Sequence, residues 1–457
     1  MTFDFLTPTT FLRKVHKYGK KLWVRVMIMG FLAIFAVAIS SVTEDWIPEK
    51  FGTALTGDAA DRLLSIIANA MLAVTTFSLS VMVSLYRSIS TQWTPRIHRL
   101  IIQDLTTQNT LAVFIGAYVY ALIAIIMREM GVFDDKRAFV LFLMTCLVLA
   151  VIVGYLIRWV LHLQSFGSLI DTSRQVEETT RQSFDERLKN PCLGARPLVD
   201  EIPSDAEVHR AQQSGYIQHI YPEALNRVAQ NHGVEIYLLR SIGDFVYINE
   251  PLLKIRRIGA RADESHTEQT LADGIGAAIT TGDLRTFDQD PRFGLVVMGE
   301  VASKALSPGV NDPGTAIDVI NRIGRVLTDY KDERTNIRDN PLDNIFVPPL
   351  DPYDLMQDGF GALARDGGAV VEVQQSLQRT LTALLSHPDE GLSRAARGAS
   401  ELHLRRALSV IEFEPDRFRL MQSASTSVAD RVSATLAGLD HEDDAPDMDR
   451  DDVQSWR

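Results

Sequence analysis

The amino-acid sequence predicts an α-helical membrane domain of four transmembrane helices, both termini cytosolic, followed by an α+β cytosolic region with a small β-module and a helical domain. Two observations predict this class. The first third of the chain contains four apolar runs, each with the roughly 20 residues that a helix needs to cross about 30 Å of hydrocarbon. The rest of the chain mixes apolar and charged residues in patterns typical of helices and strands in water.

The chain has 457 residues, which is more than a usual single domain, so we expect several structural units. The predicted segments are a cytosolic N-terminal segment (1–21), a four-helix transmembrane domain (22–162), a helical stalk and linker (163–205), a small β-rich module (206–260), a helical domain (261–439) and an acidic tail (440–457). The tail is too acidic to form a core, so we expect disorder there. A net charge of −12 argues against a nucleic-acid partner.

Four apolar runs supply the membrane helices. The first begins near Leu22, and the others extend from Leu63 to Tyr86, from Asn109 to Met127 and from Phe139 to Ile157. The basic stretch before the first run also suits a signal peptide, but its full apolar length and the three later runs favour a membrane anchor.

Lysine and arginine in the short loops predict the orientation of these helices. Basic residues precede the first run (Arg13, Lys14, Lys17, Lys20, Lys21) and follow the second and fourth runs (Arg87, Arg96, Arg99, Arg158, Arg174, Arg181). The two opposite loops are mainly acidic. We therefore expect a multi-pass membrane protein with its N- and C-termini in the cytoplasm.

The second apolar run differs from the others because small and hydroxyl-bearing residues recur along one face of it. At 100° per residue this stripe contains Ser65, Asn69, Ala73, Thr76, Ser80, Ser84 and Arg87. The stripe suits close packing against another helix, since small residues let helix backbones approach. It also suits a polar path, in which copies of this helix surround an axis in a homo-oligomer. A lipid- or ligand-binding groove is a third interpretation.

Strand and helix patterns follow in the β-rich module. Gly215–Ile220 is predicted to be a strand, 222–233 a short helix that opens on Pro and closes on Gly, and 234–242 and 245–255 further extended segments. These elements suggest a small half-open barrel. From about residue 265 to Leu439 the pattern predicts helices throughout.

Three Asp-Pro pairs mark helix starts in this region, at Asp290, Asp312 and Asp351, because Asp caps a helix and Pro suits its first position. The stretch "KALSPGVNDPGTAIDVI" should therefore be a helical hairpin. Its candidate turn and subunit-interface residues are Lys304, Ser307, Pro308, Asn311, Asp312, Pro313 and Asp318. With Asp288, Asp290 and Glu300, these charges act either as caps and ion pairs or as a divalent-cation or nucleotide sensor, provided that the fold gathers them.

Several stretches together resemble a bacterial family of predicted membrane proteins, domain of unknown function 2254. They are "ALSPGVNDPGTA", "RTFDQDPRFGL", "FSLSVMVSLYRSISTQWTPRI", "SGYIQHI" and "GDFVYINEPLL". The resemblance extends from about Lys20 to Leu420 and implies an integral protein of the bacterial inner membrane with this layout, without catalytic residues to carry over. Tyr86-Arg87 is bulkier and more charged than the pair expected from the family, so no pore-mouth geometry is carried over either.

The sequence contains no Walker loop, no GxSxG, no HExxH and no paired Cys/His cluster, so we expect neither an enzyme nor a bound metal or cofactor. Our first hypothesis is a homo-oligomeric ion channel or channel-like transport protein, lined by the second helix and gated by the cytosolic domain. Its partners would be the lipid bilayer, further copies of the chain and ions. The alternative is a non-conducting, membrane-anchored sensor or scaffold whose cytosolic domain binds a ligand or a protein.

Overall fold

The computed structural model describes residues 57–92, 105–131, 135–165, 169–258, 264–336 and 341–439, with isolated positions at 24, 26, 27, 31, 34, 35, 94, 96 and 97. The chain divides into an N-terminal unit, Met1–Thr172, and a C-terminal unit, Ser173–Arg457. The N-terminal segment 1–21, all but six positions of the first apolar run and the acidic tail lie outside the described residues.

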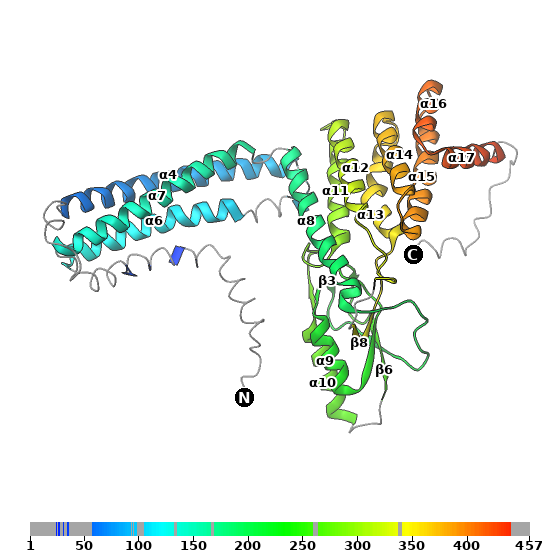
Figure 1. Cartoon of the computed structure of the whole chain (residues 1–457), viewed down its shortest axis with the longest axis horizontal. Coiled ribbons are helices and arrows are strands. Elements are labelled where there is room, and N and C mark those ends of the chain that lie inside the picture. The colour runs from blue at the N-terminus through cyan, green and yellow to red at the C-terminus, as the bar shows by residue number, and fades with distance from the viewer. Residues whose placement is uncertain are drawn as a thin grey trace. The chain divides into compact units, whose positions relative to one another are not determined.

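Three long helices pack together in the N-terminal unit (Figure 1). They are α4 (Gly57–Gln92), α6 (Leu105–Glu129) and α7 (Asp135–Ser165). Each is long and apolar enough to cross a membrane, over Ala59–Arg87, Thr106–Glu129 and Phe139–Leu163 respectively. The structure thus supports three of the four predicted membrane helices, and the remaining one falls outside the described residues.

Apolar side chains fill the space between these helices. Leu64 and Ile67 of α4 are buried against α6, whose Phe114 is also fully buried. Polar contacts join the helices at two levels: Tyr120 Oη lies 3.2 Å from Thr145 Oγ1, and an ion pair of 3.3 Å joins Arg128 to Asp61. Each of the three helices described in this unit therefore has one face fixed by packing.

The C-terminal unit combines strands and helices. Its first elements are α8 (Leu169–Lys189), η2 (Pro191–Gly194), β1 (Ala195–Pro197), β2 (Glu207–Arg210), β3 (Gly215–Ile220), α9 (Pro222–His232), β4 (Val234–Leu238), β5 (Phe245–Val246), β6 (Pro251–Arg257), α10 (Glu264–Ala278) and β7 (Ile279–Gly282). Its later elements are α11 (Pro291–Ala305), α12 (Pro313–Leu327), β8 (Leu342–Val347), α13 (Pro352–Asp366), α14 (Val371–Leu385), α15 (Glu390–Val410), α16 (Glu414–Ser423) and α17 (Thr426–Leu439).

The described strands form two sheets, with strand orders β1-β8-β4-β6-β2 and β5-β3-β7, in place of the single half-open barrel that we expected. The predicted strand Gly215–Ile220 and the predicted helix are confirmed, and Gly233 closes that helix in the left-handed conformation at φ +61°. The expectation of helix throughout from residue 265 onward is wrong at β7 and β8. Segment β8 pairs in parallel with β1 and β4 because its Ile345 and Val347 complete the core of the sheet.

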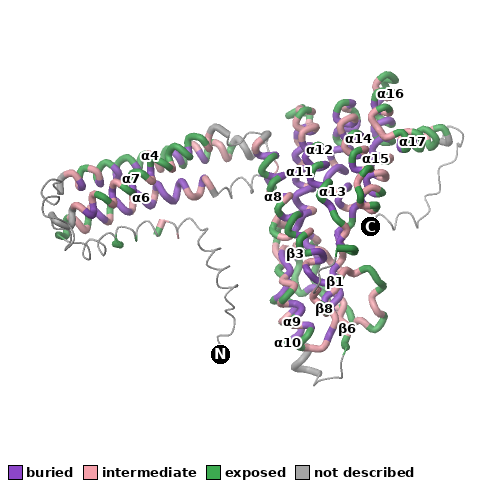
Figure 2. The backbone as a smooth tube through the Cα atoms, viewed as in Figure 1, coloured by how far each residue is buried: buried purple, intermediate pink, exposed green. Residues whose placement is uncertain are grey.

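Helices α11 to α15 lie side by side and are buried over much of their length (Figures 1 and 2). All three Asp-Pro helix starts are confirmed. The carboxylate of Asp290 accepts a hydrogen bond from the backbone N–H of Phe293, that of Asp312 from Thr315, and that of Asp351 from Tyr353. These caps satisfy N–H groups that the first turn of a helix leaves without partners.

Candidate functional site

The polar stripe of the second apolar run lies on the outward face of α4. All seven of its predicted residues are exposed, namely Ser65, Asn69, Ala73, Thr76, Ser80, Ser84 and Arg87. The residues of α4 that pack against its neighbours, among them Leu64, Ile67, Met71 and Met82, fall on the opposite side of the helix at 100° per residue. Within the described part of the unit, the stripe is therefore left uncovered.

The hydroxyl groups of the stripe are held by their own helix. Thr76 Oγ1 donates to the carbonyl oxygens of Leu72 and Ala73, and Ser80 Oγ donates to that of Thr76 at 2.9 Å. Such bonds lower the cost of placing a hydroxyl in an apolar medium, and each hydroxyl oxygen keeps the capacity to accept a bond from outside. The stripe can consequently face either a neighbouring helix or water.

Large apolar side chains border the stripe on both sides. Their exposed fractions are high: 51% for Leu72 and 50% for Leu79 on one side of the stripe, and 67% for Phe77 on the other. In a bilayer such side chains suit lipid or a neighbouring helix. The exposed surface of α4 is thus a polar strip between two apolar margins.

The predicted hairpin forms a compact turn between α11 and α12. Ser307 Oγ donates to the Lys304 carbonyl at 2.6 Å, and the backbone N–H of Asp312 donates to Ala305 across the turn at 2.8 Å. Asn311 adopts a left-handed conformation at φ +49°, and Pro308 and Asn311 are exposed at the tip. The turn closes on its own hydrogen bonds and presents this tip as a surface.

The fold does not gather the predicted carboxylates into one site. Asp290 begins α11 and Asp312 begins α12, so the two residues lie at opposite ends of a helix pair. Asp318 pairs with Arg322 of its own helix at 2.6 Å, and no ion pair between Lys304 and Asp318 is present in the described structure. The described residues also contain no group of three His, Cys, Asp or Glu side chains arranged to hold a metal ion.

Instead, a charged cluster forms at the start of α11, where three separate stretches of the sequence meet. Arg285 binds Asp290 at 2.6 Å, and Arg292 binds both Asp354 and Asp358 at 2.6 Å each. Gly243 packs directly against this cluster, because a Cβ there would lie only 2.1 Å from Asp290 Oδ2. The cluster fixes the β-strands to the helices of the C-terminal unit.

Next to this cluster, His219 of β3 lies 2.9 Å from Asp288 through its Nδ1, and its ring packs against Tyr221 at 4.3 Å between centroids. The adjacent Gln289 accepts a hydrogen bond from the backbone N–H of Ile220. The stretches "SGYIQHI", "GDFVYINEPLL" and "RTFDQDPRFGL", which are far apart in sequence, therefore contact one another in the fold.

Buried ion pairs anchor α8 inside the C-terminal unit. Glu177 accepts bonds from Arg322 at 2.6 Å and from Arg325 at 2.8 Å, and Glu177 and Arg322 are each only 8% exposed. Farther along, Glu333 binds the guanidinium of Arg187 and also accepts from the backbone N–H groups of Cys192 and Leu350. A carboxylate with this many donors holds three segments of the chain in one arrangement.

Sequence reasoning missed the partners in these clusters: Arg285, Arg292, Asp354, Asp358, Glu177, Arg322, Arg325, Arg187, Glu333 and Gly243. Most of these pairs join residues more than 60 positions apart, as in Arg292 with Asp358 and Glu177 with Arg322. Charge spacing along the chain therefore gave no indication of them. A Gly next to an Asp at 243–244 did indicate a turn, and Gly243 has φ +92°.

Taken together, the fold and these features define a helical membrane protein with apolar helices in one unit and a mixed helix-and-strand second unit. Residues 19–383 match the family described as predicted membrane protein (DUF2254). Because this match covers most of the chain, the protein belongs to that family, which confirms the resemblance found in the sequence.

Mycobacterial proteins are among the relatives of this chain. The uncharacterized protein Mb1321c of Mycobacterium bovis and the uncharacterized protein Rv1290c of Mycobacterium tuberculosis are each 27% identical to it over 313 residues. The aligned part is 65% of this chain and 59% of each relative, so the chain spans about three fifths of the length of these relatives. No solved structure matches the chain.

Proposed function

We propose that the protein is a homo-oligomeric ion channel, or a channel-like transport protein, of the bacterial inner membrane. In this proposal copies of α4 surround a polar path, and the C-terminal unit lies in the cytoplasm, with both chain termini, and gates the path. The observation that carries the proposal is the exposure of the whole stripe from Ser65 to Arg87 on the side of α4 away from its packed face.

The energetic argument concerns what covers that stripe in a bilayer. The hydroxyls of Thr76 and Ser80 are bonded within the helix, but the exposed amide of Asn69 belongs to a residue type that is unfavourable against lipid. Further copies of α4 around an axis would give Asn69 water or a polar partner, while the apolar margins at Phe77 and Leu79 would meet lipid or the next helix.

The proposed gating link is α8. It follows α7 in the chain after only three residues, 166–168. Its Glu177 is bound to Arg322 of α12 by a buried ion pair and to Arg325, an exposed residue of the same helix, by a second ion pair. A rigidly held helix so close in sequence to a membrane helix can transmit a rearrangement of the C-terminal unit to the membrane.

Flux through liposomes tests the proposal. The purified full chain is reconstituted, and the release of K⁺, Na⁺ and Cl⁻ is measured for the wild type, Thr76→Leu, Ser80→Leu and the control Ala70→Leu. Ala70 is also exposed on α4 but lies outside the stripe. We expect flux in the wild type and the control, and at least a tenfold loss in the two stripe variants, because leucine narrows and dehydrates the path.

The absence of flux for all three ions, or flux that does not respond to the stripe variants, would contradict the channel. That result would favour the alternative, a membrane-anchored sensor or scaffold.

A further inference from the structure

A row of charged side chains, mainly arginine, follows one face of α15. At 100° per residue its members fall within an arc of about 80°, namely Glu390, Arg394, Arg397, Glu401 and Arg405. Arg394 and Arg405 are exposed, and Arg397 is partly buried, with its Nε enclosed by the protein. We call this set the arginine row. From Arg394 to Arg405 it is about 17 Å long, since a helix rises about 1.5 Å per residue.

The protein neutralises only part of the positive charge of the arginine row. Glu401 is already bound by Arg431 of α17 at 3.2 Å. Among the described residues, no hydrogen bond or ion pair joins the side chains of Arg394, Arg397 or Arg405 to a partner. Like charges three or four positions apart on a helix repel one another, so an anionic partner on this face would lower the free energy.

Helix α17 brings an anionic segment of the chain close to the row. This helix packs against α15, and its Arg431 is held at Glu401, in the middle of the row. From Arg431 to Leu439 the helix advances about 12 Å, and the acidic stretch 440–452 follows directly. Thirteen residues of extended chain span up to about 43 Å. The stretch is therefore long enough to return to α15 and to follow the row from end to end.

The charge of this stretch complements the arginine row. Eight of its thirteen residues are Asp or Glu, and its one arginine is Arg450, so it is a linear polyanion. About five residues of extended chain cover the 17 Å of the row. Carboxylates spaced along a chain can bind several guanidinium groups at once, and each such bond is stronger than one between neutral groups. A single small anion cannot span the row in this way.

We propose that the acidic stretch 440–452 binds along the arginine row of its own chain. The row is then an internal docking surface, and its occupant keeps other anions away from α15 until high salt or a stronger polyanion displaces it. This contact does not involve the membrane helices, so it is independent of whether the protein conducts ions.

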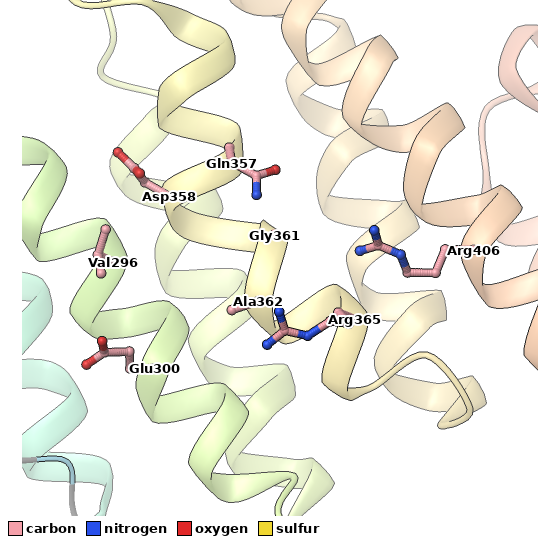
Figure 3. Close-up of a pocket in the computed structure, with 8 residues that line it drawn as sticks. All are labelled: Val296, Glu300, Gln357, Asp358, Gly361, Ala362, Arg365 and Arg406. Atoms are coloured by element: carbon pink, nitrogen blue, oxygen red, sulfur yellow. The ribbon is translucent and has the colours of Figure 1, made fainter. Parts of the chain in front are cut away.

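Arg406 supplies a matched control in the same helix. It is exposed like its neighbour Arg405, but it extends from α15 toward α13, over the shallow groove that it lines together with Gln357 and Gly361 (Figure 3). At 100° per residue it lies outside the arc of the row. A polyanion bound along the row should therefore leave Arg406 accessible.

The reactivity of single arginines in the full chain tests the proposal. Wild-type protein in detergent at low salt is treated with phenylglyoxal, which modifies guanidinium groups, and peptide mass spectrometry measures the rate at each position. A tail-neutral variant, in which every Asp of 440–452 becomes Asn and Glu442 becomes Gln, is treated in parallel. We expect Arg394 and Arg405 to react about threefold or more slowly in the wild type, because several surface ion pairs act together, and Arg406 to react equally in both.

Salt should remove this protection. At about 1 M salt the Debye length falls to about 3 Å, which screens contacts between exposed charges. The rates at Arg394 and Arg405 in the wild type should then rise to those of the tail-neutral variant. Protection that persists unchanged at this salt concentration would contradict binding by charge.

The reverse experiment follows the tail. Trypsin cleaves the full chain after Arg450, and a bound stretch is cut more slowly than a free one. The triple variant Arg394→Gln, Arg397→Gln and Arg405→Gln should be cut there about threefold or more faster than the wild type, because the row can no longer hold the tail. Arg406→Gln should be cut at the wild-type rate. A circular-dichroism melt of each variant verifies that it is folded.

Three results would overturn the proposal. Equal reactivity of Arg394 and Arg405 in the wild type and the tail-neutral variant rejects the tail as the occupant. Protection that requires phosphatidylglycerol vesicles, whatever the charge of the tail, assigns the row to lipid headgroups. Protection of the tail-neutral chain on mixing with wild-type chains assigns it to the tail of a neighbouring copy. Because no arm measures flux, failure here is separate from failure of the channel proposal.

Discussion

Asp312 shows how much of a turn can depend on one side chain. One carboxylate oxygen accepts from the Thr315 backbone N–H at 3.0 Å, and the other accepts from the Thr315 hydroxyl at 2.6 Å. These bonds begin α12 directly after Asn311, whose left-handed backbone is unusual for a residue other than glycine. The same hydroxyl bond, followed by the backbone bond, lowers the pKa of Asp312 below its usual 3.8.

Replacing Asp312 by Ala should lower the free energy of unfolding by about 1 kcal/mol, because the cap is lost. Asp312→Asn is the control, since Asn caps a helix nearly as well and should keep most of the stability. Because the pKa of Asp312 is lowered on folding, the stabilisation by its charge is present above pH 3.8 and is lost as the pH falls through the lowered value. Denaturant unfolding of the full chain in detergent, monitored by tryptophan fluorescence, measures the free energy of unfolding of both variants and its dependence on pH in the wild type.

Loss of the oligomer in Asp312→Ala with an unchanged unfolding midpoint would contradict the capping role. It would show instead that the exposed hairpin tip at 308–311 is a subunit contact, as the sequence also allowed.

At the scale of single residues, helix caps could be predicted from neighbouring residues, but ion pairs between residues far apart in the sequence could not. An Asp before a Pro specifies a helix start within four residues, so all three caps could be predicted. Arg292, by contrast, meets Asp358 across 66 positions, and only the packing of α11 against α13 brings them together. The same reason explains why the predicted carboxylate set was dispersed in the fold.

Among the elements, α8 carries the largest concentration of buried charge. Glu177 is bound by Arg322 and Arg325, and Arg322 is bound by Asp318 as well. Glu177→Gln removes one of the two negative charges around a guanidinium that is 8% exposed. Breaking a buried ion pair in this way costs about 3–5 kcal/mol, and we expect a loss near the lower end because Asp318 stays in place.

The matched control is Glu178→Gln, since Glu178 is the exposed neighbour of Glu177, and its side chain accepts a hydrogen bond from Gln182 of the same helix. Its effect should stay within about 0.5 kcal/mol, as is usual for surface substitutions. The denaturant unfolding midpoints of the two variants, measured side by side, test whether the ion pairs of Glu177 stabilise the fold. Equal midpoints would show that the ion pairs of Glu177 do not stabilise the position of α8, and the proposed gating link would lose its structural basis.

Elements were predictable where the chain signals them locally. Strand β3 and helix α9 lie within a residue of their predicted bounds, because glycine and proline mark their ends. Strand β8 was missed because it is a single six-residue segment between helices, and its partners β1 and β4 precede it by more than 100 positions. A strand of this kind is specified by the sheet that it completes.

For the whole molecule, the open question is what faces the stripe of α4 in the assembled membrane protein, and single cysteines can answer it. The Cys192 thiol is buried, and burial raises its pKa to about 12, so it stays protonated and unreactive near neutral pH. Cys146 lies in the apolar helix α7 and is replaced by alanine. Any reaction with a charged, water-soluble thiosulfonate then reports on the introduced cysteine.

In this background, cysteines at Thr76, Ser80 and Ser84 should react with the reagent in proteoliposomes, and cysteines at Ala70 and Leu79 should not. All five positions are exposed on α4, but only Thr76, Ser80 and Ser84 belong to the stripe. A difference in reactivity between the two groups therefore reports access to water and not burial within the single chain. A thiolate forms only where water reaches the sulfur, which links reactivity to a hydrated path. Stripe cysteines that form disulfides between copies yet resist the reagent would show a dry helix contact, and conduction along α4 would then be excluded.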